Sequence, residues 1–593
     1  MKTFIKNYLC PPGLLSLLRK ARQIPIRLSV KKAREKQGKF DIRYFLPSPT
    51  KCLNGGMSWN RKGVEAYTHG GYETRYAIRC PSGTDLTVSP YDLGSTEMHL
   101  AFCPADPTAP VRDLMVFLDG RKHARLKGAL QKDQWTDLRL SNIQAEVRTI
   151  KVTFEGGGHV DVADPKFPLP TRTGKMNILT LVTDNVHAPD LLAFVSNDAE
   201  QGKFPNIEKF FKGGYLFTNA FAQGNWTLPS LASMATGLYA SGHGVFNPYR
   251  FSRQIPQSLT TIAERFQADG YRTMAFSTNG RFSPSYGHHR GYDRFLFTPA
   301  CDCVTITDAG LQFMEAHRDE PFFCLLHYFD THYPFEKQQY LTHHTLPKYR
   351  WAHPSEAYLA YKEKADPEAL NDFQTFQEAK MRDLDLSMGT IFSYLERTGR
   401  MDDTTVVLIA DHAYGLRRQP VPMMRDNVAH VPLMIRVPGK AGRIDESLVE
   451  ASVDYFPTVL KLASLDIPPH AVGRDLLGDE GERKALVRSE CIFDGEYEMT
   501  LRDADWSYSL ICRVDMKTGE VFTGEVFGEY MFTRQGDCTS TPTSDTTQNL
   551  IHDEKDTARR FREAALAAIN DTKRHFGDAC HFRQPHWQPH WGK

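Results

Sequence analysis

NILTLVTD, at residues 177–184, is an apolar run that ends in an acid. Similar runs follow it along the chain, and amphipathic stretches such as SLTTIAERFQADG (258–270) stand between them. Apolar strands that alternate with amphipathic helices predict an α/β fold, with a mostly parallel sheet covered by helices on both faces. The later runs are RTMAFSTNG (272–280), PFFCLLHYFD (321–330), TTVVLIADH (404–412) and VPLMIRVPG (431–439).

Polar side chains stand where these predicted strands end. They are Asp184, Asn279, Asp330 and the pair Asp411-His412. Each acid alone fits a turn or a helix cap equally well. Together they predict a binding site, because ligands of parallel sheets gather at the carboxyl ends of the strands. Carboxylates with an imidazole favour Zn or Mn, whereas a set of oxygen ligands alone would favour Ca or Mg.

A hydroxyl residue stands at the predicted start of a helix in GNWTLPSLASMATG (224–237). Thr227 lies two residues before Pro229, and we expect the helix to begin at this proline. The first turn of a helix offers unpaired N–H groups and a positive potential, which suit a phosphate or a sulfate. A Pro-Ser pair before an apolar run is also an ordinary helix opening.

Six segments resemble, in the same order, those of the sulfatase-like branch of the alkaline phosphatase superfamily. The resemblance covers roughly residues 177–570 and implies that family's sheet flanked by helices. The segments are NILTLVTDN (177–185), TLPSLASMATGLYASGHGV (227–245), FCLLHYFDTHYPF (323–335), LIADHAYG (408–415), HVPLMIRVPG (430–439) and VDYFPTVLKLASLDIPPHAVGRDLL (453–477).

The resemblance also implies roles for individual residues. Thr227 falls at the position of the nucleophile, and its Oγ completes the ligand set of one divalent metal ion. Asp184, Asp411 and His412 fall at the other metal-ligand positions, and His332 and His430 fall near the substrate.

Four neighbouring residues receive structural interpretations. Asn185 replaces the second acid of the sulfatases' paired aspartates, and we expect a cap. Asn279 is a weaker site candidate for which a turn role is expected. His288 and His289 are candidates for second-site ligands, but an exposed loop is the expectation.

Thr227 departs from the sulfatase pattern, in which a Cys or Ser becomes formylglycine. Leu231 also stands where the motif for that modification needs an arginine. A threonine sulfate ester could not expel sulfate by elimination, whereas a phosphothreonine can be attacked at phosphorus. The sequence therefore predicts cleavage of phosphate esters through a covalent threonine intermediate. The superfamily's phosphodiesterases and headgroup phosphotransferases use the same nucleophile.

Three alternatives stay open at this point. The chain could be a sulfatase that acts without formylglycine, a phosphotransferase to an alcohol acceptor, or an inactive glycan-binding homologue. The substrate is expected to be a glycan or a lipid-linked ester, by analogy of fold alone. The net charge of +1 gives no drive towards nucleic acid.

Composition predicts four parts in the 593-residue chain. Residues 1–40 are basic, and we expect either a peripheral membrane contact or a frayed tail. Short alternating strands over 70–170 predict a β-sandwich. Residues 175–490 are expected to form the catalytic α/β domain, and residues 491–593 a small α+β subdomain and tail. The odd count of eleven scattered cysteines favours reduced thiols and a cytoplasmic protein, at most peripheral at the inner membrane surface.

Overall fold

The computed structural model describes residues 64–576 with gaps, and residues 590–591. The predicted basic segment 1–40 therefore lies outside the described residues. The gaps are 70–72, 88–97, 107, 132–133, 144–148, 164–173, 197–200, 247–253, 299–301, 333–356, 358–359, 361–366, 415–422, 479–483, 494–495, 516–519 and 535–548.

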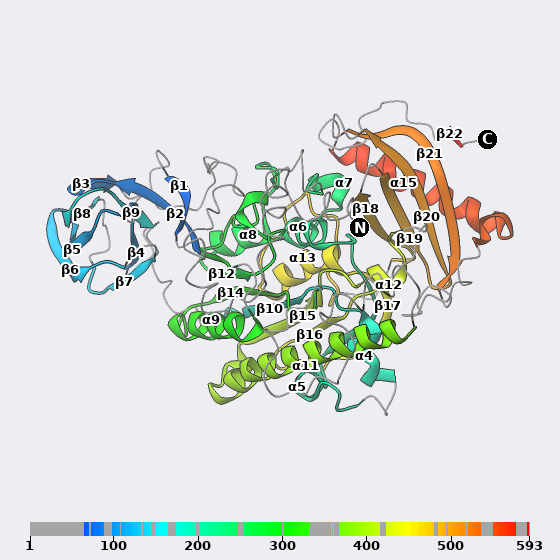
Figure 1. Ribbon diagram of the computed structural model, residues 1–593, viewed down its shortest axis with the longest axis horizontal. Helices are drawn as coiled ribbons and strands as arrows, with labels where there is room; N and C mark the ends of the chain where they lie inside the picture. Colours follow the sequence, from blue (N-terminus) through cyan, green and yellow to red (C-terminus); the bar gives the residue numbers. More distant parts are fainter. Residues whose placement is uncertain are drawn as a thin grey trace, which may run out of the picture.

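A large sheet runs through the molecule and is mostly parallel in its central part (Figure 1). β10 (Asn177–Thr183) lies between β14 (Phe322–Tyr328) and β15 (Thr404–Ala410), and both pairings are parallel. Every residue of these three strands is buried, which explains their continuous apolar runs. The sheet continues with β12 (Arg272–Ser277) and β13 (Arg294–Phe297) on one side, and with β16 (Leu433–Arg436), β11 (Tyr215–Phe221) and β17 (Ile444–Glu450) on the other.

Helices cover both faces of this sheet (Figure 1). On one face α9 (Cys303–Ala316) and α5 (Pro205–Phe211) pack on the long α11 (Pro367–Arg397). On the other face α6 (Thr227–Thr236) packs on α8 (Ile262–Ala268) and α13 (Ala451–Leu462). A shared apolar core joins these helices to the strands. The predicted α/β fold with flanking helices is thus confirmed.

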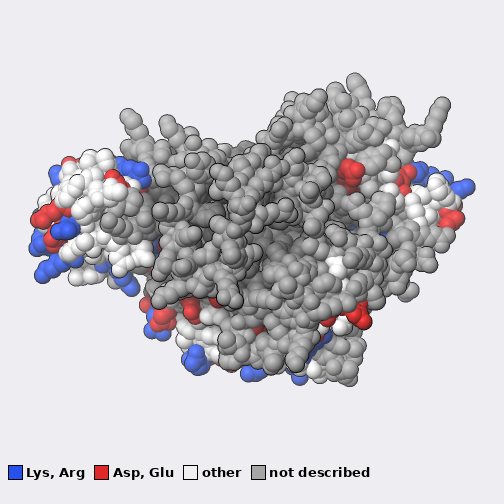
Figure 2. Space-filling model, in the orientation of Figure 1, with Lys and Arg blue, Asp and Glu red and all other residues white. Residues whose placement is uncertain are grey.

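The N-terminal strands form two layers around a core of their own. One layer is a four-stranded sheet of β3 (Thr84–Thr87), β8 (Thr149–Gly156), β5 (Val111–Leu118) and β6 (Arg121–Ala129). The other layer is β2 (Glu73–Cys80), β9 (Val160–Ala163), β4 (Met98–Pro104) and β7 (Thr136–Leu140). Figure 2 shows acidic and basic side chains mixed on the described surface at this end of the molecule.

The second layer is continuous with the central sheet, a connection that the sequence did not predict. β2, which also pairs with β1 (Val64–His69), joins β13 in an antiparallel pair. The Glu73 carboxylate accepts hydrogen bonds from Arg75 at 2.6 Å and from Arg294 at 2.8 Å. These contacts attach the N-terminal layers to the α/β part of the chain.

A five-stranded sheet lies at the end of the molecule opposite the N-terminal layers (Figure 1). Its core includes residues of α15 (Lys555–Phe576). The strands are β18 (Val487–Phe493), β19 (Glu496–Arg502), β20 (Trp506–Asp515), β21 (Glu520–Thr533) and β22 (His590–Trp591). Six cysteines in the described part of the chain are buried free thiols. No helix among the described residues is both long and apolar enough to span a membrane.

Arg502 ties this sheet to the short helix α12 (Asp426–Ala429). Its Nε donates to Asp426 Oδ1 at 2.5 Å, and both side chains are fully buried. We expect Arg502→Met to lower the free energy of unfolding by about 3–5 kcal/mol, because it removes one partner of a buried carboxylate. Urea denaturation measures this loss.

Arg560→Met is the matched control for this substitution. Arg560 pairs with Asp503, but its side chain is 56% exposed. An exposed pair contributes about 0–1 kcal/mol, so the control should unfold near the wild-type midpoint. Equal losses in both variants would contradict the role given to Arg502.

Candidate active site

Two carboxylates meet where β10 and β15 end. The register pairs Thr183 with Ala410, so the next residues, Asp184 and Asp411, stand side by side and fully buried. Asp411 Oδ1 accepts the backbone N–H groups of Asn185 at 3.2 Å and His412 at 2.8 Å. Asn185 adopts a left-handed turn, with φ of 66°, which brings its N–H to this oxygen. These bonds fix Oδ1 of Asp411 and leave Oδ2 for the site.

Two imidazoles approach the carboxylates. His412 Nε2 lies 3.7 Å from Asp184 Oδ1 and 3.6 Å from Asp411 Oδ2. His327 Nε2, from β14, lies 3.5 Å from Asp184 Oδ2 and 3.8 Å from Asp411 Oδ2. The Nδ1 of His412 faces the Ala413 carbonyl at 3.0 Å, which requires a proton on Nδ1 and turns Nε2 towards the carboxylates.

Thr227 joins this group from the first residue of α6. Its Oγ1 donates to Asp184 Oδ2 at 3.2 Å. Asn279 Nδ2 donates to the same carboxylate oxygen at 2.8 Å and to Thr227 Oγ1 at 2.9 Å. Because Thr227 opens α6, its hydroxyl lies in the first turn of that helix, where the electrostatic potential is positive.

The helix starts two residues earlier than the sequence predicted. Trp226 is its N-cap, so Thr227 and not Pro229 opens α6. Proline is tolerated in the first turn, where its missing N–H has no helical partner, so it does not have to mark the first residue. The backbone at Gly224 lies close against this turn, because a Cβ at this position would lie only 2.8 Å from the backbone nitrogen of Ser230.

The donor set fits a metal ion. Asp184 Oδ1, Asp411 Oδ2 and the Nε2 atoms of His327 and His412 are buried without hydrogen-bond partners among the described residues. Ligand atoms of Asp184, His327 and Asp411 all lie within 4.8 Å of one another. Buried charges of this kind need a counter-ion, so this group can hold a divalent cation.

The pKa directions agree with a shared negative charge. Burial and the neighbouring Asp411 raise the pKa of Asp184. Burial acts against ionisation of Asp411 as well, but His412 and His327 bring its pKa below the usual value. Burial also opposes the charged form of His412, yet Asp411 and Asp184 raise its pKa. The carboxylates of Asp184 and Asp411 thus attract positive charge to the point where they meet.

Comparison with known proteins identifies the part of the chain that carries this site. The sulfatase family profile matches residues 176–465. These residues form a sulfatase-family domain. Arylsulfatase K of Bos taurus is 24% identical over 52% of this chain and 66% of its own length, and iduronate 2-sulfatase of Mus musculus is 24% identical over 50% and 70%. The chain thus spans about two thirds of the length of these relatives.

Solved structures of other proteins share this fold. A phosphonate monoester hydrolase from Silicibacter pomeroyi superposes with a TM-score of 0.52 and 19% sequence identity. The match covers 67% of this chain and 96% of that protein. The chain therefore shares its fold with this hydrolase. The multifunctional alkaline phosphatase superfamily protein PehA of Trinickia caryophylli is 22% identical over 56% of this chain and 81% of its own length, so the similarity extends to that superfamily.

Two histidines, His332 and His430, are predicted near the substrate. Among their described interactions, only those of His332 reach a carboxylate of the site. His332 follows β14, stacks on Phe329 at 4.5 Å, and its charge acts to lower the pKa of Asp184. His430 instead holds the Thr218 carbonyl through Nε2 at 2.7 Å and stacks on Phe221 at 5.2 Å. The substrate roles of both residues stay predictions.

Sequence reasoning missed or misplaced four residues of this region. His327 lies inside an apolar strand and was not predicted. The one sequence feature that could have identified it is a single histidine within an otherwise apolar run. Asn279 does serve a turn, accepting Arg281 N–H at 2.9 Å, but its amide also bonds to the site. The exposed loop expected for His288 and His289 is wrong, because they are only 2% and 6% exposed and His288 packs edge-on against the ring of Phe282.

Proposed function

We propose that the chain is a metal-dependent ester hydrolase in which Thr227 accepts the phosphoryl group of the substrate. The observation that carries this proposal is the position of Thr227 Oγ1, which is 3.2 Å from Asp184 Oδ2 at the start of α6. An amide N–H of Asn279 points at the same oxygen. This donor stabilises negative charge on Oγ1 as the O–H bond breaks.

The reaction has two steps. Thr227 Oγ1 loses its proton to bulk water and forms a bond to phosphorus while the bond to the leaving oxygen breaks, and that oxygen takes a proton. Water then attacks phosphorus and returns one proton to the donor of the first step, and the phosphothreonine bond breaks, so that Oγ1 regains a proton from bulk water. His332 is the proposed donor of the proton to the leaving oxygen, because its described interactions place it near Asp184.

Asp184, Asp411, His412 and Thr227 Oγ1 are the proposed metal ligands, with His327 as a further donor. A bound divalent ion would lower the pKa of the threonine hydroxyl and neutralise charge on the phosphoryl oxygens. The mixed carboxylate and imidazole set favours Zn or Mn.

Sulfate ester hydrolysis is a second candidate, and the names of the relatives favour it. Arylsulfatase K and iduronate 2-sulfatase are both named for sulfate esters. Against it stands the residue at position 227, because a threonine cannot become an aldehyde through which sulfate leaves by elimination. For either chemistry we propose a glycan or lipid-linked substrate, with residues 1–40 as a peripheral membrane contact.

Parallel assays separate these functions. Zinc- or manganese-loaded protein is given bis-p-nitrophenyl phosphate and p-nitrophenyl sulfate at equal concentrations, with and without added glycerol. Phosphoester turnover that exceeds sulfate turnover by orders of magnitude supports the proposal. Faster sulfate release would establish the second candidate, and glyceryl p-nitrophenyl phosphate among the products would establish transfer. Turnover of neither ester above the buffer rate would favour an inactive homologue.

Asn279→Ala tests the donor to the nucleophile. We expect kcat to fall by about 10²–10³-fold, the usual loss for one preorganised donor, while metal content stays unchanged. Asn206→Ala is the control, because Asn206 bonds to Asp385 at 2.8 Å where α5 packs on α11. Wild-type kcat in Asn279→Ala would show that its amide has no part in the reaction.

A further inference from the structure

One sheet of the N-terminal layers carries large apolar side chains on its outer face. In β5, Leu114, Val116 and Leu118 are buried in the core between the two layers. Met115 and Phe117 alternate with them, so they lie on the opposite face of the sheet. Both are half-buried, and neither takes part in the core that the described residues form. Packing between the layers therefore does not explain why these two positions are apolar.

Basic side chains flank Met115 and Phe117 on the same face. Directly opposed residues of an antiparallel pair point to the same side of the sheet. The register sets Phe117 between Lys122 of β6 and Lys151 of β8. It also sets Arg125 of β6 beside Met115. Because neighbouring strands lie about 4.8 Å apart, a cation, an aromatic ring and a second cation follow one another across about 10 Å of this face.

Strand β6 supplies most of this positive charge. It is the edge strand of its sheet and carries four cations and no acid within nine residues. The exposed cations are Arg121, Lys122, Arg125 and Lys127. Cations on an edge strand also prevent it from pairing with other chains. That role does not require apolar residues beside them, so the two observations together indicate a binding surface.

The acids of this face are matched by other cations. They form two ion pairs and one opposed pair, which are Asp113 with Arg125 at 2.9 Å, Asp85 with Lys151 at 3.5 Å, and Glu155 opposite Arg112. Lys122 and Lys127 form no ion pair with another described residue. Lys127 follows Leu126, which packs on the core, so Lys127 points outwards as Lys122 does. The outer face thus keeps positive charge that an anionic ligand can neutralise.

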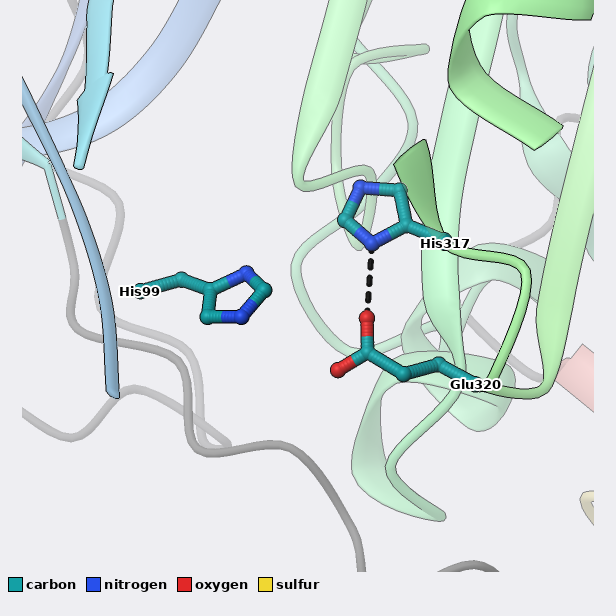
Figure 3. Close-up of side chains that lie close together, drawn as sticks. All are labelled: His99, His317 and Glu320. Atoms are coloured by element: carbon teal, nitrogen blue, oxygen red, sulfur yellow. Dashed lines mark hydrogen bonds and ion pairs between the residues drawn. The ribbon is translucent and has the colours of Figure 1, made fainter. Parts of the chain in front are cut away.

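Side chains hold the N-terminal layers against the catalytic domain, in addition to the pairing of β2 with β13. His99 of β4 stacks on His317, which follows α9, with ring centroids 6.1 Å apart. Figure 3 shows His99 directed from its strand towards His317 and Glu320. The Glu320 carboxylate contacts Nδ1 of His317 at 2.6 Å and accepts a hydrogen bond from Arg272 of β12 at 2.8 Å. A ligand on the outer face would therefore be held at a fixed position relative to the catalytic site.

We propose that the outer face of the β3–β8–β5–β6 sheet binds an anionic glycan, a chain of sugars that carries sulfate, phosphate or carboxylate groups. The apolar C–H face of a sugar ring would lie on Phe117 and Met115. The acidic groups of neighbouring sugars would accept hydrogen bonds from Lys122 and Lys127. The choice of a glycan rests on the substrate class of the proposed function.

The same features fit a single-stranded nucleic acid less well. Such a ligand stacks successive bases on several aromatic side chains. Phe117 is the one phenylalanine, tyrosine or tryptophan that these four described strands present on the outer face, because Phe154 of β8 is buried in the core. A sugar chain needs a single ring with cations on either side, which is the arrangement around Phe117.

Heparin, a sulfated polysaccharide, is the probe, and dextran of similar length is the uncharged control. Binding to the full chain is measured by isothermal titration calorimetry at constant salt, because salt screens contacts of this kind. Lys122→Gln/Lys127→Gln removes the two cations that lack an ion pair. We expect this double variant to bind heparin about tenfold more weakly, since it loses two hydrogen bonds to charged groups. Dextran bound as tightly as heparin would overturn the role given to charge.

Lys212→Gln/Lys461→Gln is the matched control. Lys212 follows α5 and Lys461 lies in α13, and both are exposed lysines of the catalytic domain. This variant makes the same change in net charge and should bind heparin as the wild type does. Equal heparin affinities of the two double variants would overturn the proposal.

Phe117→Leu tests the aromatic ring. Leucine keeps the position apolar, so the variant should melt near the wild-type temperature and bind heparin about threefold more weakly. An unchanged affinity would overturn the assignment to a glycan, because charge alone would then account for the binding. Oligothymidylate of the same charge, bound as tightly as heparin, would also overturn it.

These affinities do not depend on turnover. The comparison is repeated with Asp411→Asn in every variant, where the catalytic carboxylates are altered and the outer face is not. A failure of the proposed catalysis would leave the heparin affinities as they are, and a failure here would leave the aryl ester assays as they are. The two proposals can therefore fail separately.

Discussion

Thr227→Ala is expected to lower phosphoester turnover by roughly 10⁴-fold or more, the scale of loss when a covalent nucleophile is removed. The substitution deletes the oxygen that bonds to Asp184 and Asn279. Alanine fits the first turn of a helix, so the variant should fold and keep metal bound to the other ligands. The rate is measured with the aryl phosphodiester on metal-loaded protein.

Two variants of the same helix serve as controls. Thr227→Ser keeps a hydroxyl at the site and should retain measurable turnover. Thr236→Ala removes a buried hydroxyl that bonds only locally, to the Ala232 carbonyl at 2.7 Å, and should turn over at the wild-type rate. Mass spectrometry of protein quenched during slow turnover of the diester should place a p-nitrophenyl phosphoryl group on the peptide that contains residue 227. Wild-type turnover by Thr227→Ala would mean that water attacks the substrate directly.

The fold was predictable because its strands are buried on both faces. Such strands read as continuous apolar runs, and their polar ends identify one edge of the sheet. Asp184 and Asp411 follow from this rule, because β10 and β15 are neighbours in parallel register. The hydroxyl of Thr227 was predictable as a partner, because the first turn of a helix faces the same edge.

The remaining parts of the site depend on contacts that no local pattern encodes. His327 reaches the carboxylates because β14 pairs with β10 in a register that sets it opposite Val182. Asn279 reaches them because β12 lies next to β14, and a turn residue has no sequence mark that distinguishes this second role. The pairing of β2 with β13 likewise joins segments more than two hundred residues apart.

Asp411→Asn is expected to remove the metal ion from the catalytic site and to lower turnover by at least about 10³-fold. The backbone N–H groups of Asn185 and His412 hold Oδ1 of Asp411, so an asparagine would place its carbonyl oxygen there. Its NH₂ group would then occupy the place of Oδ2 and donate towards Asp184. The variant should fold, but a ligand becomes a donor that repels the cation.

The stability of the metal-free protein distinguishes this interpretation from simple damage. Without an ion, Asp184 and Asp411 are two buried carboxylates at one place, so Asp411→Asn should melt at the same temperature as metal-free wild type or above it. Added zinc or manganese should raise the melting temperature of the wild type and leave this variant unchanged. Asp385→Asn provides the contrast: Asp385 accepts Ile207 N–H at 2.8 Å at the start of α5, so its loss should lower stability and leave metal binding intact. An Asp411→Asn protein that still gained stability from metal would show that Asp411 is not a ligand.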